Sequence, residues 1–89
     1  MMIDNKNFLD GPLYIQIYKN IKEEIIRGTY KVGTLLPSES SLEKEYGVSR
    51  ITVRKALSEL EHDGYVKKKQ GVGTIVLDNM YLEKTKGIQ

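Results

Sequence analysis

Residues 47–60, GVSRITVRKALSEL, combine a helix start, an apolar stripe and a basic face. Ser49 is a favourable N-cap, because its hydroxyl can accept a hydrogen bond from an amide of the first turn, so we expect the helix to begin at Arg50. The apolar residues of one side recur at helical spacing: Val53, Ala56, Leu57 and Leu60. One side of this helix is therefore predicted to pack against a core, and the other is open for binding.

The open side of the predicted helix is basic at its N-terminal end. Three cations, Arg50, Arg54 and Lys55, occur before the helix reaches its first acid. Ser49 and Thr52 add short donors that suit phosphate oxygens, and long arginines can reach guanine edges in a major groove. The plainer interpretation is a solvated charged face, which is common on helices. The surrounding elements favour a DNA-reading helix.

Ile51 is apolar but points away from the apolar stripe, so it is predicted to be exposed. A thymine methyl is an apolar partner that the major groove offers, and we take it as one hypothesis for Ile51. The alternative is a single exposed apolar residue without a partner, which soluble proteins often carry.

Two more helices are predicted before this one. The first begins after Pro12 and ends at Gly28, with an apolar residue every four positions: Leu13, Ile17, Ile21 and Ile25. Residues 30–36 form a turn and a brief extended segment. Ser38 then caps a second helix of about two turns, which keeps Glu39 in its first turn and ends at Gly47. Only residues 47–49 separate it from the third helix, which is typical of a helix-turn-helix.

A β-hairpin is predicted after Gly64, with strands at residues 65–69 and 74–77 around a glycine-containing tip. Three lysines at 67–69 lead into the tip, and alternation sends the middle one to the opposite face. Lys69, Gln70 and Gly71 are candidate contacts with a minor groove or with phosphates, because glycine lets the backbone approach DNA closely. Taken alone, such a lysine run is usually an edge-strand solubility device.

Length and composition exclude several other classes. The chain has 89 residues, 39% of them hydrophobic and 29% charged, with one histidine and no cysteine. No apolar run approaches the roughly 20 residues that span a bilayer, and no basic-then-apolar leader begins the chain. We therefore expect a cytoplasmic protein that is not an enzyme and has no cofactor, metal site or membrane partner. The net charge of +2 alone says little about nucleic acid.

The predicted architecture is α+β and mostly helical: a winged helix-turn-helix of three helices and a two- or three-stranded β wing. Residues 11–77 form this domain. Residues 1–10 are expected to be a flexible arm, and residues 78–89 a linker or tail.

Four segments in order resemble the N-terminal winged-helix domain of the GntR family of bacterial transcription regulators, and the resemblance covers Pro12 to Val76. They are PLYIQI at 12–17, GTYKVGTLLPSE at 28–39, YGVSRITVRKALSELEHDGYV at 46–66 and KKQGVGTIV at 68–76. The segments SRITVRKAL and GVGTIV are most similar to the corresponding segments of the HutC-like branch of the family. The effector domains of that branch often bind sugar phosphates or amino-acid-derived ligands.

The resemblance implies binding of double-stranded operator DNA as a repressor, with two copies reading a palindrome. It implies that the chain continues into a domain, not in this sequence, that binds a small effector and drives homodimerisation. Ser40 stands where many members have an arginine, and Ile51 where many have a threonine. A protein-interaction module is the alternative function. The full set of candidate DNA contacts is Ser38, Ser40, Ser49, Arg50, Ile51, Thr52, Arg54, Lys55, Lys69, Gln70 and Gly71.

Overall fold

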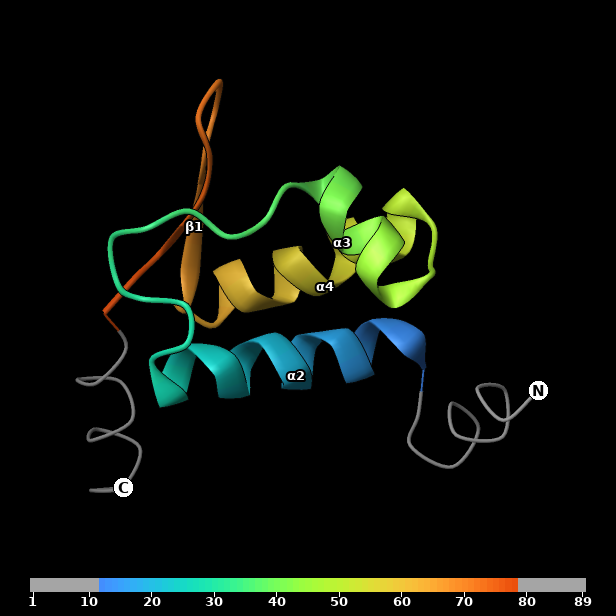
Figure 1. The fold of residues 1–89 in the computed structure, drawn as a ribbon, viewed down its shortest axis with the longest axis horizontal. Coiled ribbons are helices and arrows are strands. Elements are labelled where there is room, and N and C mark those ends of the chain that lie inside the picture. Colours follow the sequence, from blue (N-terminus) through green and yellow to red (C-terminus); the bar gives the residue numbers. More distant parts are fainter. Residues whose placement is uncertain (1–11, 79–89) are drawn as a thin grey trace.

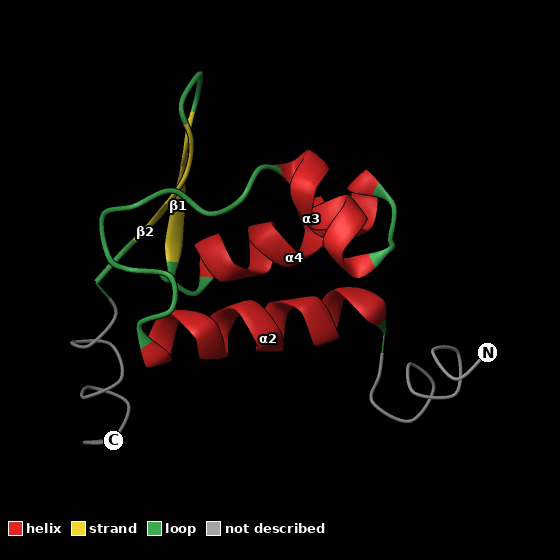
Figure 2. Cartoon of the chain, viewed as in Figure 1, coloured by secondary structure: helices red, strands yellow, loops and turns green. Residues whose placement is uncertain are grey.

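The computed structural model describes residues 12–78, and within them it contains three helices followed by a two-stranded antiparallel sheet (Figures 1 and 2). The predicted winged helix-turn-helix is therefore confirmed. Its elements are α2 (Leu13–Arg27), α3 (Glu39–Tyr46), α4 (Arg50–His62), β1 (Val66–Lys69) and β2 (Gly73–Val76).

The helices begin and end where the sequence predicts, because the caps form. The Oγ of Ser38 accepts a hydrogen bond from the amide of Ser41 at 3.0 Å, and the Oγ of Ser49 accepts one from the amide of Thr52 at 3.3 Å. Gly47 ends α3 in the left-handed conformation, with φ at 65°. The turn between α3 and α4 is therefore short and fixed at both ends.

The core lies between α4 and the other elements, and α4 packs most extensively along α2 (Figure 1). Its apolar stripe is buried, as predicted, against Ile17, Ile21 and Ile25 of α2 and Leu42 of α3. Tyr65, Val66 and Val76 close the core from the base of the wing. Because α4 packs against α2, α3 and β1, its exposed side has a fixed orientation toward solvent.

The wing is a hairpin in which Val66 pairs with Val76 and Lys69 with Gly73. Both strands begin one residue away from the predicted positions, at 66 and 73. At the start of β1, the amide of Tyr65 donates to the carbonyl of Leu60 at the end of α4, so only its carbonyl remains for the hairpin, where it accepts from the amide of Leu77. At the start of β2, Gly73 pairs with Lys69, which brings it into the strand. Leu35 adds an isolated antiparallel bridge to Ile75, which ties the predicted extended segment to the wing.

The remaining predictions about chain organisation concern residues that the structure does not describe. The flexible arm at 1–10 lies outside the described residues, and so does the linker or tail at 78–89 except for its first residue. None of the helices between residues 12 and 78 is long and apolar enough to cross a membrane.

Candidate nucleic-acid interface

The N-terminal turns of α4 form an exposed surface of two arginines and one isoleucine. The side chains of Arg50 and Arg54 are 49% and 59% exposed. Ile51 is 78% exposed, which confirms that it points away from the core. The buried stripe on the opposite side of α4 holds this surface in place. A rigid helix end that presents long cations is the geometry that major-groove reading requires.

The two arginines contact carboxylates of α3. Arg50 Nε lies 2.5 Å from Glu43 Oε2, and Arg54 Nε lies 3.0 Å from Glu39 Oε1. The hydrogen bond and the charge of Glu43 raise the pKa of the Arg50 guanidinium above its ordinary value. The N-terminal turns of α4 carry no acid of their own, as the sequence indicates. The fold nevertheless brings two acids of α3, Glu39 and Glu43, to their basic face.

Sequence reasoning missed these two glutamates as members of the site, although a signal for them exists. Glu39 and Glu43 are four residues apart on α3, and Arg50 and Arg54 are four residues apart on α4. Residues four apart share a helix face. Two helices joined by a short turn can then pair the acids and the cations in reverse order, which is the order observed.

Of the candidate hydroxyls, three lie close to these arginines or at the helix start. Ser49 caps α4, and its Oγ is 3.1 Å from the Oγ1 of Thr52. Ser40 lies beside Arg50, whose Nη2 donates to the Ser40 Oγ at 3.5 Å. Ser38 instead caps α3 and contacts Ser41, so it does not join the Arg50 cluster.

Lys55 is set apart from the two arginines. Its Nζ lies over the ring of Tyr14, 4.7 Å from the centroid, on the side of α4 that faces α2. The structure therefore does not bring Lys55 into one cluster with Arg50 and Arg54.

The wing places its predicted contacts at its tip, away from α4 (Figure 1). Lys69, Gln70 and Gly71 are exposed there. The amide of Val72 donates to the carbonyl of Lys69 at 2.9 Å, which closes the turn, and Gly71 has φ of 79°. A positive φ at this place in a turn favours glycine.

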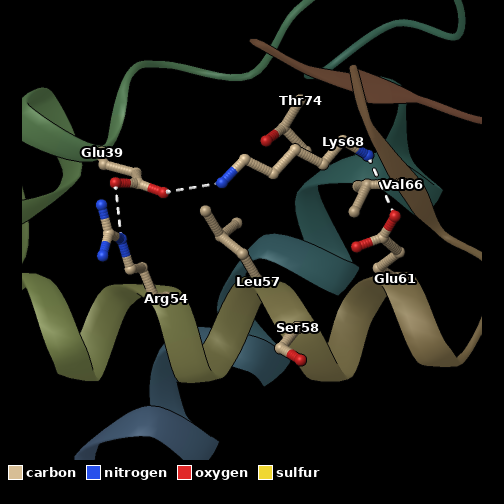
Figure 3. A pocket seen from close by; sticks show the side chains of 8 residues that line it. All are labelled: Glu39, Arg54, Leu57, Ser58, Glu61, Val66, Lys68 and Thr74. Carbon is tan, nitrogen blue, oxygen red and sulfur yellow. Dashed lines mark hydrogen bonds and ion pairs between the residues drawn. The ribbon is translucent and has the colours of Figure 1, made fainter. Parts of the chain in front are cut away.

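Lys68 points to the other face of the wing, as alternation predicts, and lines a cleft of about 210 Å³ between β1 and α4 (Figure 3). Its Nζ lies 3.8 Å from Glu39 Oε2, and its amide donates to Glu61 Oε2 at 3.2 Å. Glu39 thus contacts Arg54 with one carboxylate oxygen and Lys68 with the other (Figure 3). The carboxylate of Glu39 therefore links α3, α4 and the wing.

Comparisons with known proteins give the family. Residues 13–76 match the family described as bacterial regulatory proteins, gntR family. The Escherichia coli (strain K12) repressor of the mannosyl-D-glycerate transport/metabolism system, MngR, is 51% identical over 65 residues, which are 73% of this chain and 27% of MngR. The Bacillus subtilis (strain 168) regulator TreR is 48% identical over 65 residues, 73% of this chain and 27% of TreR. The chain therefore spans about a quarter of the length of these relatives.

Solved structures agree with this match. The DNA-binding domain of AraR in complex with operator ORX1 has a TM-score of 0.73 and 36% identity, over 74% of this chain and 80% of the AraR chain. A GntR family transcriptional regulator from Listeria monocytogenes has a TM-score of 0.77 and 30% identity, over 88% of this chain and 69% of that one. These relatives are transcriptional regulators and not enzymes, in agreement with the sequence-based prediction. The chain belongs to the gntR family of bacterial regulatory proteins, and the residues that match the family, 13–76, fold as a winged helix-turn-helix DNA-binding domain.

Proposed function

We propose that this domain binds double-stranded operator DNA in a sequence-specific way, with the N-terminal turns of α4 in the major groove and the wing tip on the flanking groove or phosphates. One observation carries the proposal: Arg50 and Arg54 are exposed side by side on a helix whose opposite face is buried in the core. The similar AraR domain is described in complex with an operator, which supports the same use of this fold here.

The residues of α4 have distinct roles in this proposal. Arg50 and Arg54 reach guanine edges, because a guanidinium can donate two parallel hydrogen bonds to O6 and N7. The hydroxyls of Ser49 and Thr52 lie at the helix N-terminus and donate to a phosphate, whose charge the helix dipole also favours. Ile51 contacts a thymine methyl, consistent with its exposure among cations.

The flanking contacts come from the wing and from the edges of the helix pair. Lys69, Gln70 and Gly71 at the wing tip contact phosphates or the minor groove beside the major-groove site. Lys55 and the hydroxyls of Ser38 and Ser40 contribute outer phosphate contacts. Phosphate contacts fix the register of the protein on the duplex and carry no base preference.

The same proposal extends to the whole regulator. Two copies read a palindromic operator as a homodimer and repress transcription in the cytoplasm. A domain that is not in this chain binds a small effector, and the regulator belongs to the HutC-like branch, with an effector of the sugar-phosphate or amino-acid-derived class. The greater length of the relatives supports a further domain, and the naming of MngR as a repressor supports repression.

Selection of bound sites from a random duplex pool, with the 89-residue chain, tests the proposal and returns half-site, symmetry and spacing together. Titration of the selected duplex should then show that Arg50→Ala costs about 1 to 3 kcal/mol, concentrated at one operator position. The matched control is Arg27→Ala, since Arg27 is also exposed and paired with a glutamate, but on α2. If parent, Arg50→Ala and Arg54→Ala give identical binding curves, the proposal is wrong and a protein-interaction role is favoured.

Salt dependence gives a second measurement. If each copy neutralises about four phosphates, the logarithm of the binding constant should fall with the logarithm of salt concentration with a slope near −0.9 per phosphate. A binding constant that does not change between low and physiological salt would contradict phosphate neutralisation and hence the proposal.

A further inference from the structure

Arg50 and Arg54 are the two reading arginines, that is, the arginines proposed to contact bases. The Nε of each donates a hydrogen bond to a glutamate of α3. Arg50 pairs with Glu43 at 2.5 Å and Arg54 with Glu39 at 3.0 Å. The glutamate side chains are only 27% and 23% exposed, about half the exposure of the arginines they hold. The carboxylates therefore lie beneath the interface, and the guanidinium groups lie above them toward solvent.

The atom engaged in each pair matters for recognition. A guanidinium has five N–H donors in a planar fork, and the bond from Nε to a carboxylate uses one of them. Of the two terminal nitrogens of Arg50, Nη2 also reaches Ser40 Oγ, at 3.5 Å. The outer edge of the fork keeps donors with which it can meet the O6 and N7 acceptors of a guanine.

The two ion pairs contribute little to folding stability, because water reaches the arginines and screens the attraction, and holding two long side chains in one geometry costs conformational entropy. Their consequences for DNA are larger. A carboxylate beside each arginine lowers the positive charge that attracts phosphates anywhere on a duplex. It also restricts the side-chain rotamers before binding, which reduces the ordering cost of forming a base contact.

We propose that Glu39 and Glu43 are specificity-determining positioning residues, which hold the guanidinium groups of Arg54 and Arg50 toward the base edges and away from phosphates. This inference rests on the proposed function. An arginine that moves to a phosphate must leave its carboxylate, whereas an arginine that binds a guanine with its outer edge keeps it. The glutamates thus disfavour non-specific binding more than operator binding.

Glu43 offers the cleaner test of the two, because Glu39 also contacts Lys68 of the wing at 3.8 Å (Figure 3). The variant Glu43→Gln keeps an oxygen acceptor for Arg50 but removes the charge. The matched control is Glu45→Gln, which removes the same charge from the same helix, where the carboxylate acts on Tyr30 and Tyr46. Circular dichroism checks that both variants fold.

The affinity of the 89-residue chain is measured on its selected operator and on a scrambled duplex of equal length and composition, at one salt concentration. For Glu43→Gln the ratio of operator to scrambled affinity should fall by at least about five-fold, the lower end of what one bidentate base contact supplies. Binding to the scrambled duplex should become tighter. For Glu45→Gln the ratio should stay within about two-fold of the parent, because its charge does not act on a reading arginine.

Repeating the site selection with the variants supplies a readout that a structural role alone would not change. Glu43→Gln should relax the base preference at the operator position read by Arg50 and leave the position read by Arg54 intact. Glu39→Gln should do the reverse. If Glu43→Gln and Glu45→Gln have the same affinity ratio as the parent, the inference is wrong while the proposed function stands. If the parent itself prefers no duplex, the proposed function fails.

Discussion

The ammonium group of Lys55 lies over the ring of Tyr14, which places a cation–π contact between α4 and the first turn of α2. Cation–π contacts at exposed sites are worth about 0.5 to 1 kcal/mol. Lys55→Ala should therefore lower the free energy of unfolding by about that amount, as measured by urea denaturation, whereas Lys55→Arg should retain it.

The same contact sets an expectation for DNA binding by Lys55→Ala. Because Lys55 is held on the α2 side of the helix, its loss should weaken binding equally for all duplexes and leave the base preference unchanged. A changed preference at one operator position would mean instead that Lys55 leaves Tyr14 and reads a base.

Ser49 has two separable roles that different substitutions distinguish. Its Oγ accepts from the amide of Thr52, so Ser49→Ala should reduce the free energy of unfolding by about 1 kcal/mol. Aspartate is an equally good N-cap, so Ser49→Asp should keep the stability. The added carboxylate should nevertheless weaken DNA binding, since it repels the phosphate that the serine hydroxyl contacts.

Thermal or urea unfolding and operator titration of both Ser49 variants measure the two effects. A Ser49→Asp variant that binds the operator as tightly as the parent would restrict Ser49 to its capping role.

The helices and their ends could be predicted from sequence because the signals are local. Ser38 and Ser49 bond within their own first turns, and Gly47 takes a positive φ that ends α3, so neighbouring residues alone decide these features. The exposure of Ile51 also follows from the helical spacing of a single element.

The partners of the arginines could not be predicted in the same way. Whether Glu39 and Glu43 reach Arg54 and Arg50 depends on how α3 and α4 pack across Leu42 and the α4 stripe, which is tertiary information. The position of Lys55 depends likewise on where α2 lies. A prediction based on the charge pattern of one helix therefore placed Lys55 with the two arginines and gave them no acidic partners.

Ile51 provides a prediction that compares protein and DNA changes. Because Ile51 is 78% exposed, Ile51→Ser should change the free energy of unfolding by no more than about 0.5 kcal/mol. If its partner is a thymine methyl, replacing that thymine by deoxyuridine should weaken parent binding by roughly 0.8 kcal/mol, the value for one buried methylene-sized group.

The protein substitution and the DNA substitution form a double-mutant cycle, in which titration measures the binding affinity of each pair. Ile51→Ser should bind the thymine and deoxyuridine duplexes with equal affinity, whereas Ile51→Val should still distinguish them. Equal discrimination by the parent and Ile51→Ser at every thymine of the operator would contradict the methyl contact.

Tyr46 connects stability to alkaline pH. Burial raises the pKa of its phenol above the usual 10.0 and the charge of Glu45 adds to this, while the hydrogen bond from Asn20 acts in the opposite direction. The folded state therefore holds the phenol proton more tightly than the unfolded state does. The resulting stabilisation is complete below the unfolded pKa, near pH 10, and is lost as the pH rises through the folded pKa.

Urea unfolding of the parent should accordingly give a free energy that falls as the pH increases above about 10, and Tyr46→Phe should reduce that fall because it removes the titrating group. Tyr30, whose pKa is also raised by burial, should account for part of the slope that remains, so the double variant with Tyr30→Phe should be flatter still. If Tyr46→Phe and the parent lose stability in parallel through this range, the phenol of Tyr46 titrates alike in both states, and burial does not protect its proton.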